Sequence, residues 1–478
     1  MSIYILLYPC NFINFRNFGF IAFNLIIMKK FLLLSIALIS GFILKAIEPS
    51  GTLPVIYITT QNNAEITSTE TYINAAFYID AKSSGYASVG SASSQSAMKI
   101  RGRGQASWTN YDKKPYRFKL TLGVQLLGMS KSKNYALMAY ADDPHAFLRA
   151  TTGYKVSQLM NLVYTPDRRA VELVLNGDYK GLYFLTETVR VDKDRVPIVK
   201  QDDNTTDASL VSGGWLLEID NVDDAEQVTI TDGSGNTARF SYKDPEELST
   251  QQSNYLMEQL NGMDDAIYAT DKTSTKWQEY IDIDTLARYY IVQEVMDNFK
   301  AFNGSTYLYK DRGTTSNWNF GPVWDFGDAF MREGQQFIYV NPPKVPQIWI
   351  GEIAKFPAFQ AKVRELWPDF YKNQYSKISG HIDSFIASIK SAAASDVQRW
   401  PAYGCSDLSA KATEFKALLD ARVKWLNEQW TGTGVEEIEF NDNAPIEYYN
   451  LQGVKTANPQ GGIFIKVQGC KATKVNIK

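Results

Sequence analysis

The chain has 478 residues, of which 45% are hydrophobic and 13% aromatic, so it is long enough for two or three folded units and its composition excludes a mainly disordered protein. Its formal net charge of -3 gives no support for nucleic-acid binding as the main role. Only two histidines, His145 and His381, are present, which excludes a His-rich metal site.

Residues 1–46 have the pattern of an N-terminal extension followed by a targeting segment. Two lysines come directly after Met28, an apolar run covers residues 31–44, and Ala46 is a small residue at which cleavage can occur. These three features are typical of a secretory signal peptide. We therefore expect translation to start at Met28 and the protein to be exported to the cell surface, the periplasm or the medium. A signal anchor is the alternative, because apolar character begins at Phe18, and no later run is long enough to span a membrane.

The chain from residue 47 to about residue 240 is predicted to be rich in strands. Its segments carry β-branched and aromatic residues between Gly, Asn and Ser turns. One hairpin is indicated by Asn176-Gly177, because a primed two-residue turn needs positive φ at both positions. The strand candidates are residues 53–60, 71–81, 170–189 (as the hairpin), 213–220 and 227–232.

Helices are predicted to dominate after about residue 240. Residues 245–269 are amphipathic, and residues 282–299 have apolar residues at helical spacing with Asp282 or Asp284 as the N-cap. A second hairpin is expected from residues 305–311 and 317–326, with Asp325 at the end of its returning strand. Residues 356–430 then predict a helical bundle.

The C-terminal end is predicted to be a separate module. Residues 431–434, Thr-Gly-Thr-Gly, indicate a linker, and residues 435–478 alternate short strand candidates with Asn, Gly and Pro turns. In an oxidising compartment Cys405 and Cys470 can form one disulfide, but the sequence does not decide whether they do.

A basic segment, residues 98–120, combines Arg and Lys with glycine. Arg101 and Arg103 share a face if this segment is a strand, and the neighbouring glycines allow close approach of a ligand to the backbone. Such a segment can hold phosphate groups. The alternative is a solvated strand face, which is the common fate of clustered charge.

Two acids stand on either side of the second predicted hairpin. Asp297 lies near a helix C-terminus, where the helix dipole disfavours a negative charge, so this carboxylate requires a cation such as Mg²⁺ or the Lys300 ammonium. Asp325 lies between Trp324 and Phe326, where a carboxylate is costly without a partner. Asp297 and Asp325 are therefore candidates for one metal-dependent site.

Several motifs together resemble the CotH kinase family, the spore-coat-type atypical protein kinases. They are IRGRGQASW at 100–108, KKPYRFKL at 113–120, LNGDYKGLYFLTE at 175–187 and GPVWDF at 321–326. The resemblance covers roughly residues 52–430. It implies an α+β, atypical protein-kinase-like fold within residues 47–430, with a β-rich N-terminal part and a helical C-terminal part.

The resemblance also implies roles for individual residues in phosphoryl transfer with ATP and Mg²⁺ or Mn²⁺. Asp297 is expected to be the catalytic acid, and Asp325 with Asn298 or Asn303 to be the metal ligands. The residues expected to bind the nucleotide are Arg101, Arg103, Lys114, Glu187 and Trp318. Glu187 is expected to pair with a phosphate-directed cation or, alternatively, with Arg190. Trp324 is a second candidate for stacking on adenine. Gly327 and Lys300 depart from the family pattern, which has acids near these places, and Asp328 can compensate.

The C-terminal module resembles the β-sandwich sorting domains of type IX secretion. The resemblance is carried by YYNLQGV at 448–454 and GGIFIKV at 461–467. It implies recognition by the secretion machinery and delivery to the cell surface, often with removal of the module.

The function we expect is an exported protein kinase that transfers the ATP γ-phosphate to Ser or Thr of a secreted or surface protein. It is expected to have no nucleic-acid partner and no membrane span once the signal is removed. A catalytically degenerate CotH-like protein that binds a glycan or a protein partner is the alternative. A glycoside hydrolase that uses Asp297 and Asp325 as its carboxylate pair ranks last, because the basic segment has no role in that chemistry.

Overall fold

The computed structural model describes residues 47–220, 226–313, 316–340, 347–431, 445–451, 453–468 and 471–477. The chain divides into the units Met1–Glu48 and Pro49–Lys478. The predicted signal segment and Cys470 lie outside the described residues, so neither the signal nor the Cys405–Cys470 pairing is tested. Among the helices that the structure describes, none has the length and apolar character that a membrane span requires.

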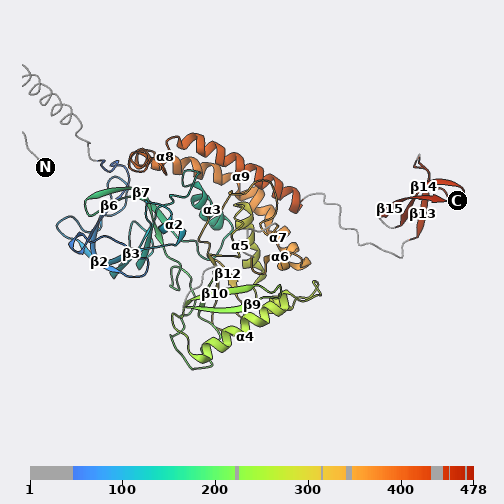
Figure 1. The fold of residues 1–478 in the computed structure, drawn as a ribbon, viewed down its shortest axis with the longest axis horizontal. Helices are drawn as coiled ribbons and strands as arrows, with labels where there is room; N and C mark the ends of the chain where they lie inside the picture. The colour runs from blue at the N-terminus through green and yellow to red at the C-terminus, as the bar shows by residue number, and fades with distance from the viewer. Residues whose placement is uncertain are drawn as a thin grey trace, which may run out of the picture. The chain divides into compact units, whose positions relative to one another are not determined.

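The N-terminal part of the second unit is a closed sheet (Figure 1). Its strand order is β1-β2-β3-β4-β5-β7-β6, and β1 closes the sheet by pairing in parallel with β6. Alternate side chains such as Ile100, Phe118 and Leu137 fill its interior and are almost completely buried. The strands are β1 Val55–Thr60, β2 Ile73–Asp80, β3 Ser96–Gly102, β4 Tyr116–Val124, β5 Ser132–Met138, β6 Arg168–Leu175 and β7 Asp178–Glu187.

The hairpin predicted at Asn176-Gly177 is present between β6 and β7. Asn176 has φ 52° and Gly177 has φ 81°, which is the pair of positive values that a primed turn needs. The Asn176 side chain also accepts a hydrogen bond from the Thr60 amide at 2.8 Å, so the turn is tied to the end of β1.

A second sheet has the strand order β12-β11-β8-β10-β9. Helix α4, Thr250–Ile267, packs beside β9 (Figure 1) and begins at a capping box between Ser249 and Gln252. The strands are β8 Trp215–Asp220, β9 Gln227–Thr231, β10 Thr237–Asp244, β11 Thr306–Lys310 and β12 Asn319–Phe320.

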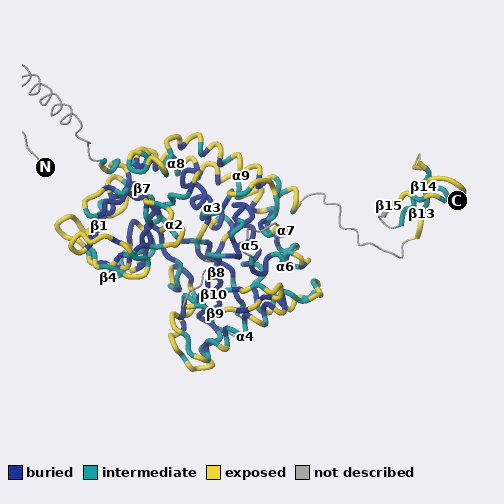
Figure 2. Tube along the Cα trace, viewed as in Figure 1, coloured by how far each residue is buried: buried dark blue, intermediate teal, exposed yellow. Residues whose placement is uncertain are grey.

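Helix α5, Ile283–Val295, lies at the centre of the helical part and contacts α3, α7 and α9. Asp282 is its N-cap and accepts a hydrogen bond from the Thr285 amide. Figure 2 shows that α5 is mostly buried, whereas α8 and α9 have exposed outer faces. The other helices are α2 Ala106–Thr109, α3 Leu148–Leu159, α6 Ile350–Ile353, α7 Pro357–Asp369, α8 Ser376–Arg399 and α9 Leu408–Thr431, with short turns at Gln61–Asn63, Lys276–Glu279 and Phe370–Gln374.

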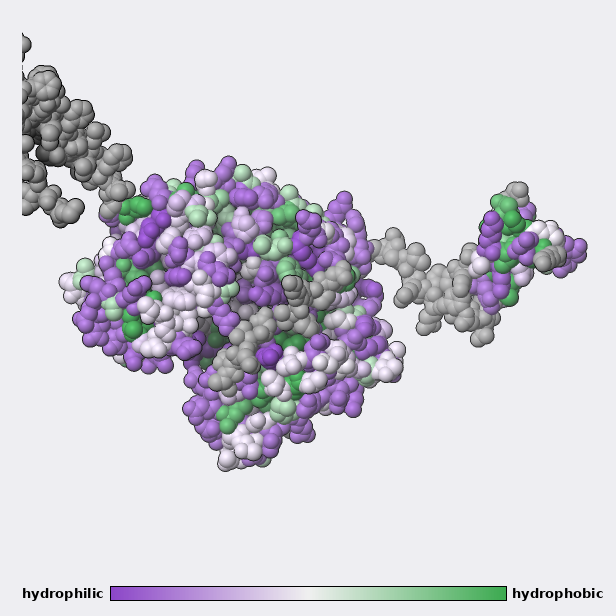
Figure 3. All heavy atoms as spheres, viewed as in Figure 1, coloured by the Kyte–Doolittle hydropathy of each residue, from purple (hydrophilic) through white to green (hydrophobic). Residues whose placement is uncertain are grey.

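Hydrophilic side chains cover much of the face shown in Figure 3, and apolar ones are interspersed among them. Separately, the C-terminal strands β13 Ile446–Tyr449, β14 Gly462–Gln468 and β15 Lys471–Ile477 form an antiparallel three-stranded sheet. The β-sandwich, its type IX identity and the domain boundaries stay predictions.

The predicted α+β class and the β-rich N-terminal part are confirmed. Helix α3 was not predicted within that part. The strands of the second hairpin pair as predicted. The predicted end of the returning strand at residue 326 is wrong, because β12 ends at Phe320. Gly321 has φ 116° and Pro322 has no amide proton to donate to a neighbouring strand, so Asp325 lies in a loop beyond the sheet.

Candidate functional site

A cavity of about 510 Å³ opens where several chain segments converge. The segments are the loops after β3, β5 and α5, the end of β8, the start of α3 and the loop after β12. Its charged and amide side chains are Arg103, Gln105, Asn110, Lys113, Asp142, Asp143, Arg149, Glu218, Asp220, Asn298, Lys300, Asp325 and Asp328. Because these residues come from both halves of the unit, only the tertiary fold assembles the cavity.

The carboxylates of Asp142 and Asp325 both lie beside Gly327. A Cβ built on Gly327 would lie 3.1 Å from Asp325 Oδ1 and 3.3 Å from Asp142 Oδ2. Glycine at this position therefore leaves room for the two carboxylates to converge. Burial raises the pKa of Asp142, Arg149 opposes that effect, and the charge of Asp325 adds to it. Two converging carboxylates whose charges repel provide a place for a cation.

Asn298 stands next to this pair and has a fixed orientation. Its Nδ2 donates to the backbone oxygen of Asp325 at 2.8 Å and to Gln293 Oε1 at 2.8 Å. Within the described part of the chain, no hydrogen bond reaches Asn298 Oδ1. The amide oxygen is therefore available as a third oxygen ligand beside the carboxylates, which agrees with the predicted role of Asn298 without testing it.

Asp325 itself is exposed, and its Oδ1 accepts a hydrogen bond from the Gly327 amide at 2.8 Å. This bond holds the carboxylate at the start of the loop. The sequence predicted that a carboxylate between two aromatic side chains needs a partner. Here the Asp325 carboxylate faces solvent, because only Phe326 is buried while Trp324 is partly exposed.

Buried cations form the inner wall of the cavity. Lys113 is 1% exposed and lies 2.9 Å from Asp396 of α8, and burial lowers its pKa. Arg149 donates to Asp143 at 3.0 Å, to the Asp142 backbone oxygen at 2.7 Å and to the Gly327 backbone oxygen. Arg149 thus joins the loop after β5 to the loop that carries Asp325.

Arg101 and Arg103 of the basic segment do not act together. Strand β3 ends at Gly102, so the prediction that Arg101 and Arg103 share a strand face is wrong. Arg101 lies over the Tyr72 ring and donates to the Thr69 backbone oxygen, away from the cavity. Arg103 lines the cavity and lies 5.5 Å from the centre of the Trp324 ring.

Of the two tryptophans considered for base stacking, only Trp324 lines the cavity. Trp318 is completely buried, and its backbone pairs with that of Ile281. Trp318 is therefore a core residue, although it was predicted to bind the nucleotide.

Glu187 and Lys114 also lie outside the cavity lining. Glu187 is 2% exposed and accepts hydrogen bonds from backbone and hydroxyl donors of Ser130, Tyr164 and Asp167. It is paired neither with a phosphate-directed cation nor with Arg190 among the described contacts. Lys114 donates to the Trp108 backbone oxygen at 2.5 Å.

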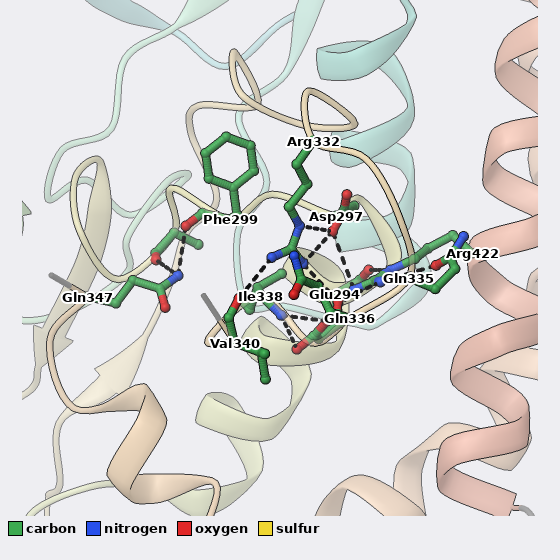
Figure 4. Close-up of polar contacts among 11 residues, drawn as sticks. Glu294, Asp297, Phe299, Arg332, Gln335, Gln336, Ile338, Val340, Gln347 and Arg422 are labelled. Atoms are coloured by element: carbon green, nitrogen blue, oxygen red, sulfur yellow. Dashed lines mark hydrogen bonds and ion pairs between the residues drawn. The ribbon is translucent and has the colours of Figure 1, made fainter. Parts of the chain in front are cut away.

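Asp297 lies behind the cavity, in a buried cluster of two acids and two arginines (Figure 4). Asp297 follows the end of α5, has a backbone φ of 44°, and is 4% exposed. Arg332 donates to Asp297 Oδ1 at 2.7 and 2.9 Å, and Arg422 of α9 lies 3.5 Å from the same atom. The helix end does receive the cation that the dipole argument demanded, and Arg332 and Arg422 supply it.

The second acid of the cluster is Glu294, which is completely buried. Arg422 donates to its carboxylate at 2.5 Å and to its backbone oxygen at 2.7 Å, and the Ile338 amide donates to it at 3.0 Å. Burial raises the pKa of Glu294 to about 7, with Arg422 opposing. Both arginines also donate to the Gln336 backbone oxygen at 2.8 Å. We call these four charged residues, Glu294, Asp297, Arg332 and Arg422, the arginine clamp.

Asn303 is buried, and it too is not among the residues that line the cavity. The structure thus brings Arg103, Asn298 and Asp325 together out of the nine predicted site residues. It places Asp297, Arg101, Lys114, Glu187, Trp318 and Asn303 elsewhere.

Sequence reasoning missed Asp142 and Arg149 as members of the site. The available signal was weak: two acids before Pro144, directly after a strand, and an arginine in a segment not recognised as a helix. Among the described residues, no group of three or more His, Cys, Asp or Glu side chains is arranged to hold a metal ion. A divalent cation here would therefore depend on Asp325 and the Asn298 amide, with the Asp142 carboxylate nearby, together with oxygens of a ligand.

Comparison with known families places this arrangement in context. A family model described as CotH, CotH kinase protein, matches residues 100–426. This range includes every residue that lines the cavity. The comparison with curated proteins found no match.

Proposed function

Because the chain belongs to the CotH kinase protein family, we propose that the cavity binds ATP with Mg²⁺ or Mn²⁺ and transfers the γ-phosphate to a Ser or Thr hydroxyl of a protein. One observation carries this proposal. The carboxylates of Asp142 and Asp325 converge beside the Asn298 amide in a cavity whose walls also carry Arg103, Lys113 and Arg149.

The residues present fit a magnesium ion. Mg²⁺ is commonly held by one or two carboxylates together with phosphate oxygens and water, and it dehydrates reluctantly. Asp325 and the Asn298 Oδ1 atom would hold it, and when bound it neutralises charge on the phosphates. The hydrogen bond from Asn298 Nδ2 to the Asp325 backbone fixes one ligand relative to the other.

The cationic residues would receive the phosphates. Arg103 reaches the cavity from the glycine-rich loop after β3, where Gly104 has φ 76° and lets the backbone turn. Trp324 offers a partly exposed indole for the adenine, with Arg103 near its ring. Lys113 and Arg149 are already paired with carboxylates, so they would add positive potential rather than a free donor.

In the transfer step, the acceptor oxygen bonds to the γ-phosphorus while the bond from that phosphorus to the bridging oxygen breaks and ADP leaves. The hydroxyl proton must go to a base within the cavity. Asp142 is suited to this role, because its pKa is raised by burial and it lies opposite the proposed metal ligand. Asp297 is not assigned this role, because it does not line the cavity and its Oδ1 is contacted by Arg332 and Arg422.

Export, and recognition of the C-terminal module by secretion machinery, belong to the same proposal. They rest on the signal-peptide pattern of residues 28–46 and on the motifs at 448–454 and 461–467. The acceptor would then be a secreted or surface protein.

The proposal is tested by the melting temperature of the protein with ATP and Mg²⁺ or Mn²⁺. A ligand that binds only the folded state raises this temperature. We expect a metal-dependent rise in the wild type and in Asp202→Asn, an exposed acid outside the cavity, and a loss of the rise in Asp325→Asn. Transfer is then measured with γ-labelled ATP and secreted proteins. No rise in any of the three proteins contradicts the proposal and favours the alternative, a degenerate binding protein for a glycan or protein partner.

A further inference from the structure

Lys300 reaches into the same carboxylate group from the turn that follows α5. Its Nζ lies 3.1 Å from Asp328 Oδ2, and both residues line the cavity with Asp142 and Asp325. The side chains are partly exposed, 44% for Lys300 and 35% for Asp328. An ammonium group thus stands at the mouth of the cavity among three acids.

The backbone holds Lys300 in this place. Its carbonyl oxygen accepts hydrogen bonds from the amides of Asn303 at 3.1 Å and Gly304 at 3.3 Å. Lys300 is also two residues from Asn298, whose side chain is fixed to the Asp325 backbone. The main chain that carries Lys300 is therefore held close to Asn298, and the ion pair with Asp328 positions the ammonium.

The ion pairs in the cavity show which carboxylates Lys300 and Arg149 contact. Arg149 is the other cation near these acids, but its closest carboxylate is Asp143 at 3.0 Å, and it lies 3.7 Å from Asp142. The Lys300 ammonium is thus the cation paired with Asp328, in a cavity that Asp142 and Asp325 also line.

We propose that Lys300 is a built-in cation of the ATP site, which takes over part of the neutralising role of a divalent ion and weakens binding of that ion. This inference rests on the proposed function, since it concerns the same cavity. A second positive charge within a few ångströms of the ammonium is repelled, so free Mn²⁺ should bind weakly. Triphosphate, by contrast, should retain affinity without metal, because Lys300 and Arg103 remain to meet its charge.

The test uses the full protein and two titrations followed by calorimetry, one with Mn²⁺ alone and one with ATP in excess EDTA. Removal of the charge in Lys300→Met should tighten Mn²⁺ binding about tenfold and weaken metal-free ATP binding about tenfold, as expected for one partly screened charge pair. Lys300→Arg keeps the charge and should behave as the wild type. Lys390→Met removes an exposed lysine of α8 outside the cavity and serves as the matched control.

Equal Mn²⁺ affinity in the wild type and Lys300→Met would overturn the inference, as would failure of Lys300→Met to bind Mn²⁺ at all. Should Lys300→Met fail to fold, Lys300→Gln is titrated instead, with the same expected direction. The proposed function fails separately: if ATP binds neither with nor without Mn²⁺, the nucleotide site is wrong, while the titration with Mn²⁺ alone still decides the role of Lys300.

Discussion

Asp297 and Asp325 are the same kind of side chain at the two ends of the β11–β12 region, and the fold uses them in opposite ways. Asp297 is 4% exposed and held by Arg332 and Arg422 (Figure 4). Asp325 is exposed at the cavity, where, among the described residues, its carboxylate accepts a hydrogen bond from the Gly327 amide of its own loop. The first carboxylate stabilises the fold, and the second remains available to a ligand.

A carboxylate near a helix end is therefore not by itself evidence of a catalytic residue. The helix dipole makes a negative charge at this place costly, and either a metal ion or an arginine can compensate it. In this protein two arginines do so, from segments that lie after Asp297 in the sequence. Arg332 and Arg422 both contact Asp297 Oδ1, and Asp297 does not line the cavity, so this carboxylate is placed differently from Asp325.

The largest effect should come from breaking the arginine clamp at Arg422. Arg422→Met leaves Glu294 buried without its partner and should lower the free energy of unfolding by about 3–5 kcal/mol. Urea denaturation followed by circular dichroism measures this. Lys424→Met, at an exposed position on the same helix, should change the value by less than about 0.5 kcal/mol. Similar losses in both variants would show that the clamp adds little.

Replacing one acid at a time by its amide separates the stabilising role of Asp297 from the binding role of Asp325. Asp297→Asn keeps a side chain that tolerates φ 44° but removes the charge that meets Arg332 and Arg422, so we expect a loss of about 1.5–3 kcal/mol of stability. Its nucleotide-dependent rise in melting temperature should persist. Asp325→Asn should show the reverse: nearly wild-type stability and no metal-dependent rise. If Asp297→Asn alone abolishes the rise while keeping its stability, Asp297 is a site residue after all.

Glu294 gives the clamp a pH dependence with a definite sign. Its pKa is raised from 4.5 to about 7 in the folded state, so the folded protein binds the proton more tightly than the unfolded chain. Its contribution to stability is complete below about pH 4.5 and is lost as the pH rises through about 7. Relative to Glu294→Gln, the wild type should therefore lose stability between these values. A difference between the two proteins that does not vary over this range would contradict the shift.

The smallest effect on stability should come from a substitution that crowds the exposed Asp325 carboxylate. Gly327→Ala places a methyl group 3.1 Å from Asp325 Oδ1 and 3.3 Å from Asp142 Oδ2. Since Asp325 is exposed and can move, the free energy of unfolding should change by less than about 1 kcal/mol. Mn²⁺ affinity, measured by calorimetry, should fall as the two carboxylates separate. Gly380→Ala, where the methyl group enters open space on α8, should leave Mn²⁺ binding unchanged.

Local patterns in the sequence were enough for several elements of the fold. The Asn176-Gly177 turn, the helix start at Asp282 or Asp284 and the strand at Trp215–Asp220 depend on neighbouring residues and on side-chain alternation, so they could be predicted without knowledge of the fold. The structure selects Asp282 as the N-cap. The short length of β12 was missed, although Pro322 gave a local reason to end the strand.

The candidate site was predictable only in part, because its members meet through tertiary contacts. Residue patterns alone were sufficient to predict the α+β class, the family resemblance and Asp325, Asn298 and Arg103 as candidate site residues. The fold was needed to show that Asp142 and Asp325 both lie beside Gly327, that Lys300 lines the cavity, and that Asp297 belongs to the arginine clamp. Charges pair through space, so the partner of a carboxylate can lie anywhere along the chain, and spacing in the sequence does not reveal it.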